Sequence, residues 1–187
     1  MNKPKRILLY GFGPYRQFRN NITKRIIEAL PRQAGLKKII FPVRFHRGQF
    51  VTAVQKFKPD LIVGLGQSAR QRIAVESRAI NRRRARRTSK PKPISLTGPQ
   101  RLKTTLPLNA GNQARRSMSA GDYVCNFSMY VMLDQIRRGG LNIPYGFVHI
   151  PHDYDEKKGI GLVRKMLLQC RRMETIANAK TAAAKKG

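Results

Sequence analysis

Acidic residues are scarce in this chain. Its 187 residues include 9 Asp and Glu against 39 Lys and Arg, so the formal net charge is +30 and the isoelectric point is near 11.5. A chain of this charge attracts polyanions without any sequence-specific site. The basic residues are densest in residues 82–93, where the candidate contacts for RNA or DNA are Arg82, Arg83, Arg84 and Arg87. No aromatic residue is interleaved with these arginines, which argues against base stacking. The charge alone leaves open whether it is functional or only compositional.

Cysteine is scarce as well. Cys125 and Cys170 are the only two, and they provide no disulfide framework. A free reactive thiol fits a reducing cytoplasm better than a secreted setting. No apolar run approaches the length of a membrane span, and the first residues lack the apolar core and cleavage site of a signal peptide. We therefore predict a cytoplasmic protein with no membrane partner.

Phosphate- and metal-binding signatures are also missing. The GFGPY motif near the start lacks the spacing of GxGxxG and of GxxxxGK[ST], which argues against a nucleotide site. His149 and His152 form an HxxH pair, but Pro151 interrupts any helix that would align them. Neither cysteine has the spacing of a zinc ligand. We expect no metal ion and no cofactor.

Short apolar runs alternate with helical patterns along the chain. Strands are predicted at residues 7–10, 39–43, 61–63 and 147–150, and helices at 23–30, 45–57, 126–138 and 161–177. Continuous apolar strands that alternate with helices are typical of a mostly parallel sheet with helices on both faces. We predict such an α/β fold, with a ligand site at the carboxyl ends of its strands.

No linker or internal repeat divides the chain, so residues 1–176 are predicted to form a single domain. Residues 177–187 are rich in Ala and Lys, and they either extend the last helix or fray. Residues 77–99 contain three prolines, no acid and little periodicity, which is typical of a long loop.

One cysteine stands in a dense local motif. Residues 119–130 read SAGDYVCNFSMY, and Cys125 lies where a loop is expected to turn into a helix. That helix ends in Arg137 and Arg138 followed by two glycines, a common termination. Partial positive charge at a helix start favours the thiolate, which is the nucleophilic form of cysteine. Cys125 is therefore a candidate nucleophile, although a cysteine is often only a small buried apolar residue. Cys170, in a leucine-containing helical segment, fits that second description.

Two further residues suit the same chemistry. His149 lies near the end of the apolar segment YGFVHIP, and a histidine at a strand end is the usual partner that activates a thiol. Glu76 is the only acid between Asp60 and Asp122. An acid that orients the imidazole completes a triad of nucleophile, base and orienting group. Whether the three side chains meet in space is left open by the sequence.

Five sequence blocks carry a resemblance to one family. In chain order they are ILLYGFGPYRQFRNNIT, GQSAR followed by ESRAIN, GPQRLKTTLP, SAGDYVCN and GFVHIP. They resemble the GFxPFGG, GQAGGR with ERVAIN, GPxxxxSTLP, SAGTYVCN and GFIHVP blocks of pyroglutamyl peptidase I, also called pyrrolidone-carboxylate peptidase, a family of cysteine peptidases. The order and approximate spacing agree from about residue 7 to about residue 168.

The resemblance implies a fold and a set of residue roles. The fold is a three-layer α/β/α sandwich with a mostly parallel twisted sheet. The activity is removal of an N-terminal pyroglutamyl residue from a peptide, without metal or organic cofactor. Cys125 would be the nucleophile, His149 the general base and then acid, and Glu76 the residue that orients His149. Arg86 would lie at the oxyanion.

The same resemblance implies a substrate pocket. Its walls would be Phe12, Tyr15, Tyr123 and Val124. Gln67 would hydrogen-bond the lactam, and Asn21 would help hold the loop that carries Arg86.

The chain also departs from the family pattern. Tyr15 replaces a phenylalanine, and Arg84 and Arg87 replace the aspartate and isoleucine of an NxxDARI run. The GQSAR loop is one residue short, and the shorter stretch between TLP and SAG indicates a trimmed helix. Two functions therefore stay open. The first is a peptidase acting on pyroglutamyl peptides, favoured by the intact triad. The second is a weak or inactive member that binds nucleic acid or ribosomes, favoured by the altered pocket. The sequence also leaves open whether the chain forms a homo-oligomer.

Overall fold

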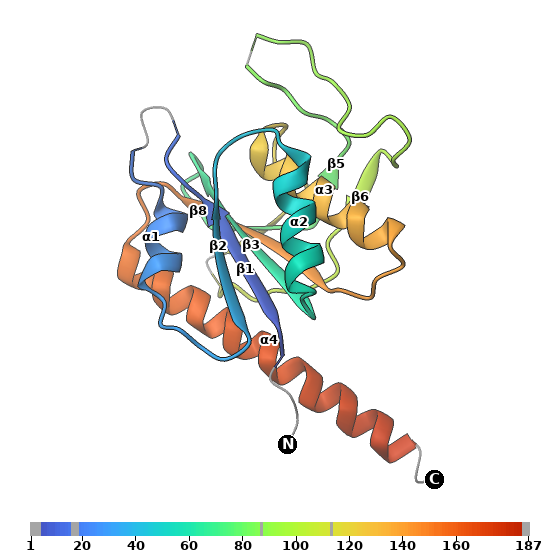
Figure 1. Ribbon diagram of the computed structural model, residues 1–187. Helices are drawn as coiled ribbons and strands as arrows, with labels where there is room; N and C mark the ends of the chain where they lie inside the picture. Colours follow the sequence, from blue (N-terminus) through green and yellow to red (C-terminus); the bar gives the residue numbers. More distant parts are fainter. Residues whose placement is uncertain (1–4, 16–18, 87, 113, 185–187) are drawn as a thin grey trace.

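Six strands form one sheet in the order β2-β1-β3-β8-β4-β7 (Figure 1). The computed structural model describes residues 5–184 except 16–18, 87 and 113, with side chains as far as Arg172. The strands are β1 Ile7–Phe12, β2 Leu36–Phe41, β3 Leu61–Ser68, β4 Ala74–Glu76, β7 Arg115–Ser117 and β8 Tyr145–Pro151. The first three strands and β8 run parallel, whereas β4 pairs antiparallel with β8 and parallel with β7.

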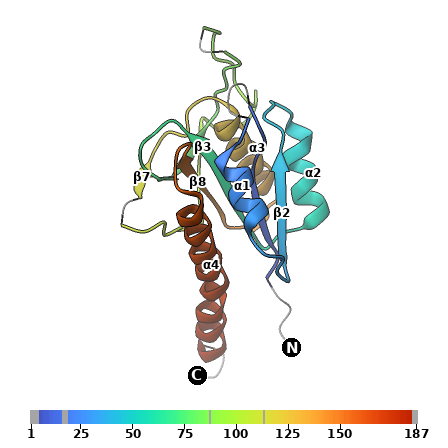
Figure 2. The same cartoon turned by 90° about the vertical axis from the view of Figure 1, so that its left-hand side faces the viewer.

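Helices cover both faces of this sheet (Figure 2). Helices α1 Ile22–Ala29 and α4 Glu156–Ala184 pack on one face, and α2 Arg47–Phe57 and α3 Val124–Arg138 pack on the other. Strands β1 and β8 are buried along their whole length, as expected for strands covered on both sides. The predicted α/β sandwich with a mostly parallel sheet is confirmed.

The segment predicted as a long loop, residues 77–99, contains regular structure. Strand β5 Arg78–Ile80 pairs antiparallel with β6 Arg101–Lys103 in a separate two-stranded sheet. Beyond β5, an antiparallel bridge joins Arg83 to Lys92, and the intervening chain projects from the body of the molecule (Figure 1). Strands of three residues carry too little alternation to be recognised from sequence. The stretch between TLP and SAG contains β7 and no helix among its described residues.

Helix α4 is longer than predicted. It begins at Glu156 rather than at residue 161 and continues through Ala184, so it includes most of the Ala/Lys-rich segment. Residues 185–187 lie outside the described part of the chain. None of the helices in the described part is both long and apolar enough to cross a bilayer.

The chain connections place a crevice at one edge of the sheet. From β1 the chain passes through α1 to β2 on one side, and then through α2 to β3 on the other side of β1. Strands that diverge in this way open a gap at their carboxyl ends, where α/β proteins bind ligands. Phe12 ends β1, Ser68 ends β3, and His149 lies two residues before the end of β8. The candidate residues at these strand ends lie within the strands rather than after them.

Candidate active site

Cys125 is the second residue of α3. The preceding N-cap residue, Tyr123, has an extended backbone, and its side chain does not cap the helix. The first turn also contains no acid, so neither a capping side chain nor a carboxylate neutralises its N–H groups. The half-buried thiol therefore lies at the positive end of a helix of 15 residues. Helix α3 ends with Arg137 and Arg138 in its last turn and Gly139 as C-cap, as the sequence indicates.

His149 and Glu76 meet because β4 pairs with β8. The Nδ1 atom of His149 lies 2.8 Å from Oε1 of Glu76, and the exposed fractions of the two residues are 5% and 0%. Burial alone would lower the pKa of His149, but its interactions with Cys125 and with the Glu76 carboxylate raise it to about 9. Burial alone would raise the pKa of Glu76, but hydrogen bonding to His149 and the charges of His149 and Arg70 hold it below its usual value.

Gly66 allows the thiol and the imidazole to approach each other. A Cβ atom built on Gly66 would lie 2.9 Å from Sγ of Cys125 and 2.8 Å from Cδ2 of His149. Both side chains therefore pack against the backbone of β3 at the same residue. Any larger residue at this position would displace one of them. The structure thus brings together the three residues that the sequence proposed as a triad.

A small pocket opens beside Cys125. Its volume is about 210 Å³, below the range of pockets for drug-sized ligands, so it suits one small ring rather than an extended peptide. The rings of Tyr15 and Tyr123 lie 5.2 Å apart at one wall. All six residues predicted to bind substrate line this pocket, and they are Phe12, Tyr15, Asn21, Gln67, Tyr123 and Val124. The pocket is also lined by Val43, Ser68, Ala69 and His152, which no sequence motif marks as pocket residues.

Three polar side chains in the pocket differ in what they offer a ligand. Gln67 accepts a hydrogen bond from the Ile22 N–H at 2.9 Å through its side-chain oxygen, which leaves its amide NH₂ as the group for a ligand. Asn21 caps α1 by accepting from the Thr23 N–H and donates to the Gly13 carbonyl at 3.1 Å. It thus holds the loop after β1 rather than the arginine loop. The Ser68 hydroxyl is buried and has no hydrogen-bond partner within the described residues.

The described arginines of residues 82–86 do not line the pocket. Arg86 is exposed, belongs to the projecting segment and is not among the described residues that line the pocket. Arg84 instead pairs with Asp122 at 3.0 Å, and Arg82 lies 3.8 Å from the same carboxylate. The Arg83 guanidinium stacks on Phe45. Arg87 falls outside the described residues. The base of the projection is therefore attached beside Tyr123, and the role of Arg86 at the oxyanion stays a prediction.

Sequence reasoning missed two residues that hold the site. Arg70 bonds Oε1 of Glu76 at 2.9 Å, Oγ of Ser117 at 3.1 Å and the carbonyl of Ser119 at 2.5 Å. Fully buried Asn126 bonds both backbone groups of Ile80. Both lie inside the blocks that carry the resemblance. Asn126 directly follows Cys125, and Arg70 ends GQSAR, so their places in these blocks were the available signal.

No cluster that could hold a metal ion occurs in the part of the chain that the structure describes. Groups of three or more His, Cys, Asp or Glu side chains are absent there. The site consists of a thiol, an imidazole, a carboxylate and a small aromatic pocket. These are the groups that nucleophilic catalysis at a carbonyl group requires.

Comparison with known proteins places this site in a family. The family profile for pyroglutamyl peptidase matches residues 5–185. Pyrrolidone-carboxylate peptidase 1 of Saccharolobus solfataricus is 31% identical over 166 residues, which cover 78% of each chain. The pyrrolidone-carboxylate peptidase of Oceanobacillus iheyensis is 34% identical over 79% of this chain and 84% of its own. The solved pyrrolidone carboxyl peptidase of Thermococcus litoralis shares the fold, with a TM-score of 0.82, 21% identity and coverage of 93% of this chain and 96% of its own. The chain belongs to the pyroglutamyl peptidase family of hydrolases.

Proposed function

We propose that this protein hydrolyses the amide bond that follows an N-terminal pyroglutamyl residue in a peptide. Cys125 acts as nucleophile, His149 as general base and then acid, and Glu76 as the group that orients His149. The observation that most supports this assignment is the packing at Gly66, where the thiol and the imidazole meet against one glycine. The carboxylate of Glu76 lies 2.8 Å from the other ring nitrogen of the same imidazole.

The hydrogen bond to Glu76 fixes the tautomer of His149. An ionised carboxylate only accepts, so Nδ1 of His149 carries a proton and Nε2 is left for the thiol. His149 takes the thiol proton, and the resulting thiolate attacks the carbonyl carbon between pyroglutamate and the next residue. The N–H groups of the first turn of α3 stabilise the oxyanion, since they lie at the positive end of the helix.

Collapse of the tetrahedral intermediate completes the first half of the reaction. The His149 imidazolium donates its proton to the departing amine, and the C–N bond breaks to leave a thioester on Cys125. His149 then removes a proton from water, which attacks the thioester and releases pyroglutamate. His149 returns the proton to the departing thiolate, which restores the starting state.

The pocket favours an uncharged N-terminus. None of the described residues that line it is acidic, so the ammonium of an ordinary N-terminus would lose hydration without gaining a carboxylate partner. A lactam ring is neutral, and its flat faces suit the walls formed by Phe12, Tyr15 and Tyr123. The Gln67 amide NH₂ donates to the lactam carbonyl.

A cleavage assay with two cysteine variants tests this function. The substrate is pyroglutamate coupled through its carboxyl group to a fluorogenic amine. Cys125→Ala should abolish turnover, because it removes the nucleophile. Cys170→Ala should retain nearly full activity, because Cys170 is buried in α4 away from the pocket. Far-UV circular dichroism serves as the folding control.

Equal loss of activity in both variants would reject Cys125 as the nucleophile. Absence of cleavage by the wild-type protein would reject the peptidase itself. A prolyl amide with a free amino terminus serves as the specificity control, and it should be a much poorer substrate than the pyroglutamyl amide.

A further inference from the structure

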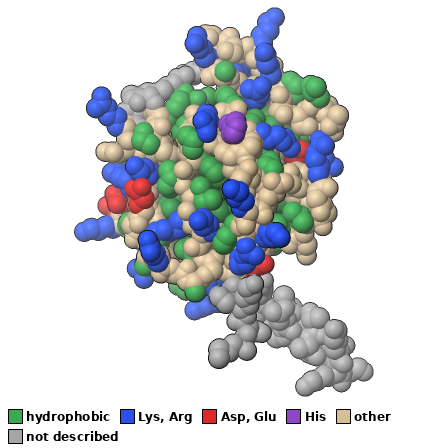
Figure 3. Space-filling model, viewed as in Figure 1, with side chains coloured by type: hydrophobic (Ala, Val, Ile, Leu, Met, Phe, Trp, Pro, Cys, Tyr) green, Lys and Arg blue, Asp and Glu red, His purple; other side chains and the backbone are tan. Residues whose placement is uncertain are grey.

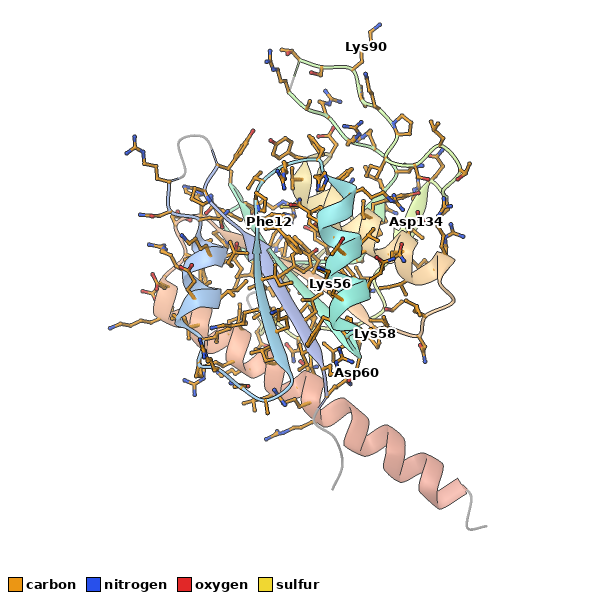
Figure 4. All side chains as sticks on the ribbon, viewed as in Figure 1. Phe12, Lys56, Lys58, Asp60, Lys90 and Asp134 are labelled. Carbon is orange, nitrogen blue, oxygen red and sulfur yellow. The ribbon has the colours of Figure 1, made fainter. Side chains whose placement is uncertain are left out.

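The projecting segment is strongly basic along its length. We call residues 82–92 the arginine hairpin. Seven of its eleven residues are Arg or Lys, and no acid occurs between Glu76 and Asp122. Lys90 and Lys92 are exposed, and Figure 4 shows Lys90 at the far end of the projection, beyond the edge of the sheet at which Phe12 lies. The space-filling view shows the same projection carrying Lys and Arg side chains (Figure 3). The hairpin therefore extends a cationic arm past the carboxyl edge of the sheet.

The base of the arginine hairpin is fixed to the helix that carries the nucleophile. Asn126, next to Cys125, donates to the carbonyls of Ile80 and Arg82 at 2.9 and 2.8 Å. The Arg84 N–H donates to the Asp122 carbonyl at 2.7 Å, and the Arg84 side chain pairs with the Asp122 carboxylate. Backbone bonds in both directions between Arg83 and Lys92 join the two sides of the hairpin. These contacts determine where the arm leaves the body of the protein.

That position is beside the pocket. The Arg83 guanidinium lies 5.5 Å from the centre of the Phe45 ring, and Phe45 packs edge-on against Tyr123 at 5.2 Å. Tyr123 is itself a wall of the pocket. The rings of Phe45 and Tyr123 therefore lie between the hairpin base and the pocket.

A peptide substrate has to pass this arm. The pocket of about 210 Å³ holds the pyroglutamyl ring, so the rest of the peptide must leave it into solvent. An extended chain advances about 3.3–3.6 Å per residue, so residues two to four places after the pyroglutamate come within reach of a neighbouring surface about 10 Å away. The acids closest in sequence to the pocket walls are Asp122, which is engaged by Arg82 and Arg84, and Asp153, which follows His152. The cations of the arginine hairpin therefore dominate the electrostatic field where the peptide leaves the pocket.

We propose that the arginine hairpin selects pyroglutamyl peptides with acidic residues two to four places after the pyroglutamate. This inference rests on the proposed function, since it concerns the remainder of the same substrate. Exposed ion pairs are individually weak and are screened by salt. Two acidic residues should therefore raise kcat/KM by about threefold to tenfold at low ionic strength, and the advantage should shrink as salt is added.

Matched peptides and matched variants test the selection. The substrates are pyroglutamyl-Ala-Glu-Glu-Ala amide and pyroglutamyl-Ala-Gln-Gln-Ala amide, and release of pyroglutamate is followed by chromatography. Lys90→Gln with Lys92→Gln should remove most of the preference for the acidic peptide. The control is Arg32→Gln with Lys37→Gln, which removes the same charge from two exposed residues. Arg32 lies between α1 and β2 and Lys37 is the second residue of β2, so both are far from the carboxyl ends of the strands and the preference should be retained. All three proteins should cleave the fluorogenic pyroglutamyl amide equally, because it has no downstream residues.

The outcomes separate this inference from the proposed function. Failure to cleave the fluorogenic amide rejects the peptidase. Binding of the two peptides, labelled at the C-terminus, to Cys125→Ala then still tests selection by fluorescence anisotropy. Equal kcat/KM values for the two peptides at low salt, or equal loss of preference in both double variants, overturns the inference. Salt-dependent binding of an RNA oligonucleotide through Lys90 and Lys92, without any preference between the peptides, also overturns it and assigns the hairpin to nucleic acid.

Discussion

A single oxygen atom of Glu76 serves two partners. Its Oε1 lies 2.8 Å from Nδ1 of His149 and 2.9 Å from the guanidinium of Arg70. Arg70 also bonds Ser117 and Ser119, in the segment that leads into α3. One arginine thus connects Glu76 to the loop before Cys125. We expect it to act as a positioning residue, because it reaches the reaction only through Glu76 and that loop.

Replacement of Arg70 should change both the rate and its pH dependence. Arg70→Gln removes a positive charge that helps to keep the pKa of Glu76 below its usual value, so that pKa should rise. The acidic limb of kcat/KM should therefore move to higher pH. The alkaline limb follows loss of the His149 imidazolium near pH 9 and should move less. We expect kcat to fall about tenfold with KM within about twofold, as measured with the fluorogenic amide between pH 5 and 10.

Arg70→Lys is the matched variant for this prediction. A lysine keeps the charge near Glu76 but cannot reproduce the branched contacts to Ser117 and Ser119. It should restore the position of the acidic limb and only part of kcat. An acidic limb that is the same in wild type, Arg70→Gln and Arg70→Lys would show that Arg70 has no influence on Glu76 and serves packing alone.

The elements that were predictable from sequence are those with their own local signals. Helix α3 has an apolar body, two arginines in its last turn and glycines after it, so its end at Arg138 follows from local chemistry. Strands β1 and β8 are buried on both faces and appear as continuous apolar runs. The proximity of Cys125, His149 and Glu76 was suggested by residue types and by family resemblance, and the pairing of β4 with β8 creates the contact between two of them.

The elements that were missed depend on distant partners. Strands β4, β5, β6 and β7 have three residues each, and each exists because another strand lies beside it. The exposure of Arg86 depends on distant partners as well. The resemblance gave its place along the chain, but the ion pair of Arg84 with Asp122 and the bridge between Arg83 and Lys92 determine where the hairpin points. Contacts of this kind are absent from local sequence patterns.

Helices α2 and α3 are joined by one buried acid. Asp134 of α3 is 0% exposed and bonds Arg47 of α2 at 3.0 Å and Arg137 and Arg138 at 2.9 Å. Arg138 also donates a hydrogen bond to the hydroxyl of Thr97 at 2.9 Å. Burial would raise the pKa of Asp134, but the hydrogen bonds from the three arginines lower it. This cluster attaches α2 and the loop before β6 to α3, the helix that contains Cys125.

Asp134→Asn should therefore weaken the packing of these elements. The amide keeps the volume but leaves three arginines without a buried carboxylate, so the free energy of unfolding should fall by about 1–3 kcal/mol. Because the pKa of Asp134 is lowered on folding, its stabilising contribution is present above the unfolded pKa of about 4 and is lost as pH falls through the folded value. Urea denaturation at pH 7 and pH 3 measures both effects. The variant should be less stable than wild type at pH 7, and the gap should narrow at pH 3.

Asp153→Asn is the control for this prediction, because Asp153 is exposed. It should change stability by less than about 0.5 kcal/mol. Equal stability of Asp134→Asn and wild type at pH 7 would contradict a structural role for the cluster. It would mean that the free energy lost by dehydrating the buried carboxylate equals the free energy gained from its ion pairs.

The molecule as a whole carries far more positive than negative charge. Several acids already have cationic partners, as with Lys24 and Glu28 on α1 and Arg25 and Glu156 between α1 and α4. With 39 basic and 9 acidic residues, most cations have no acid available to pair with. The face in Figure 3 shows Lys and Arg side chains scattered across it and few acidic ones. Repulsion among these cations opposes the compact state.

Salt should therefore stabilise the fold. Unfolding moves the cations apart, so screening their repulsion favours the folded state, and the Debye length shortens from about 30 Å at 0.01 M to about 3 Å at 1 M. We expect Tm at pH 7 to rise by about 5 °C or more between about 0.02 and 0.5 M NaCl, because about 2 kcal/mol of relieved repulsion corresponds to such a shift in a domain of this size. Differential scanning calorimetry measures it. Sodium sulfate at equal ionic strength should raise Tm further if anions bind the surface. A Tm that falls with NaCl would mean that pairs such as Arg25 with Glu156 outweigh the repulsion, because screening weakens surface attractions as well.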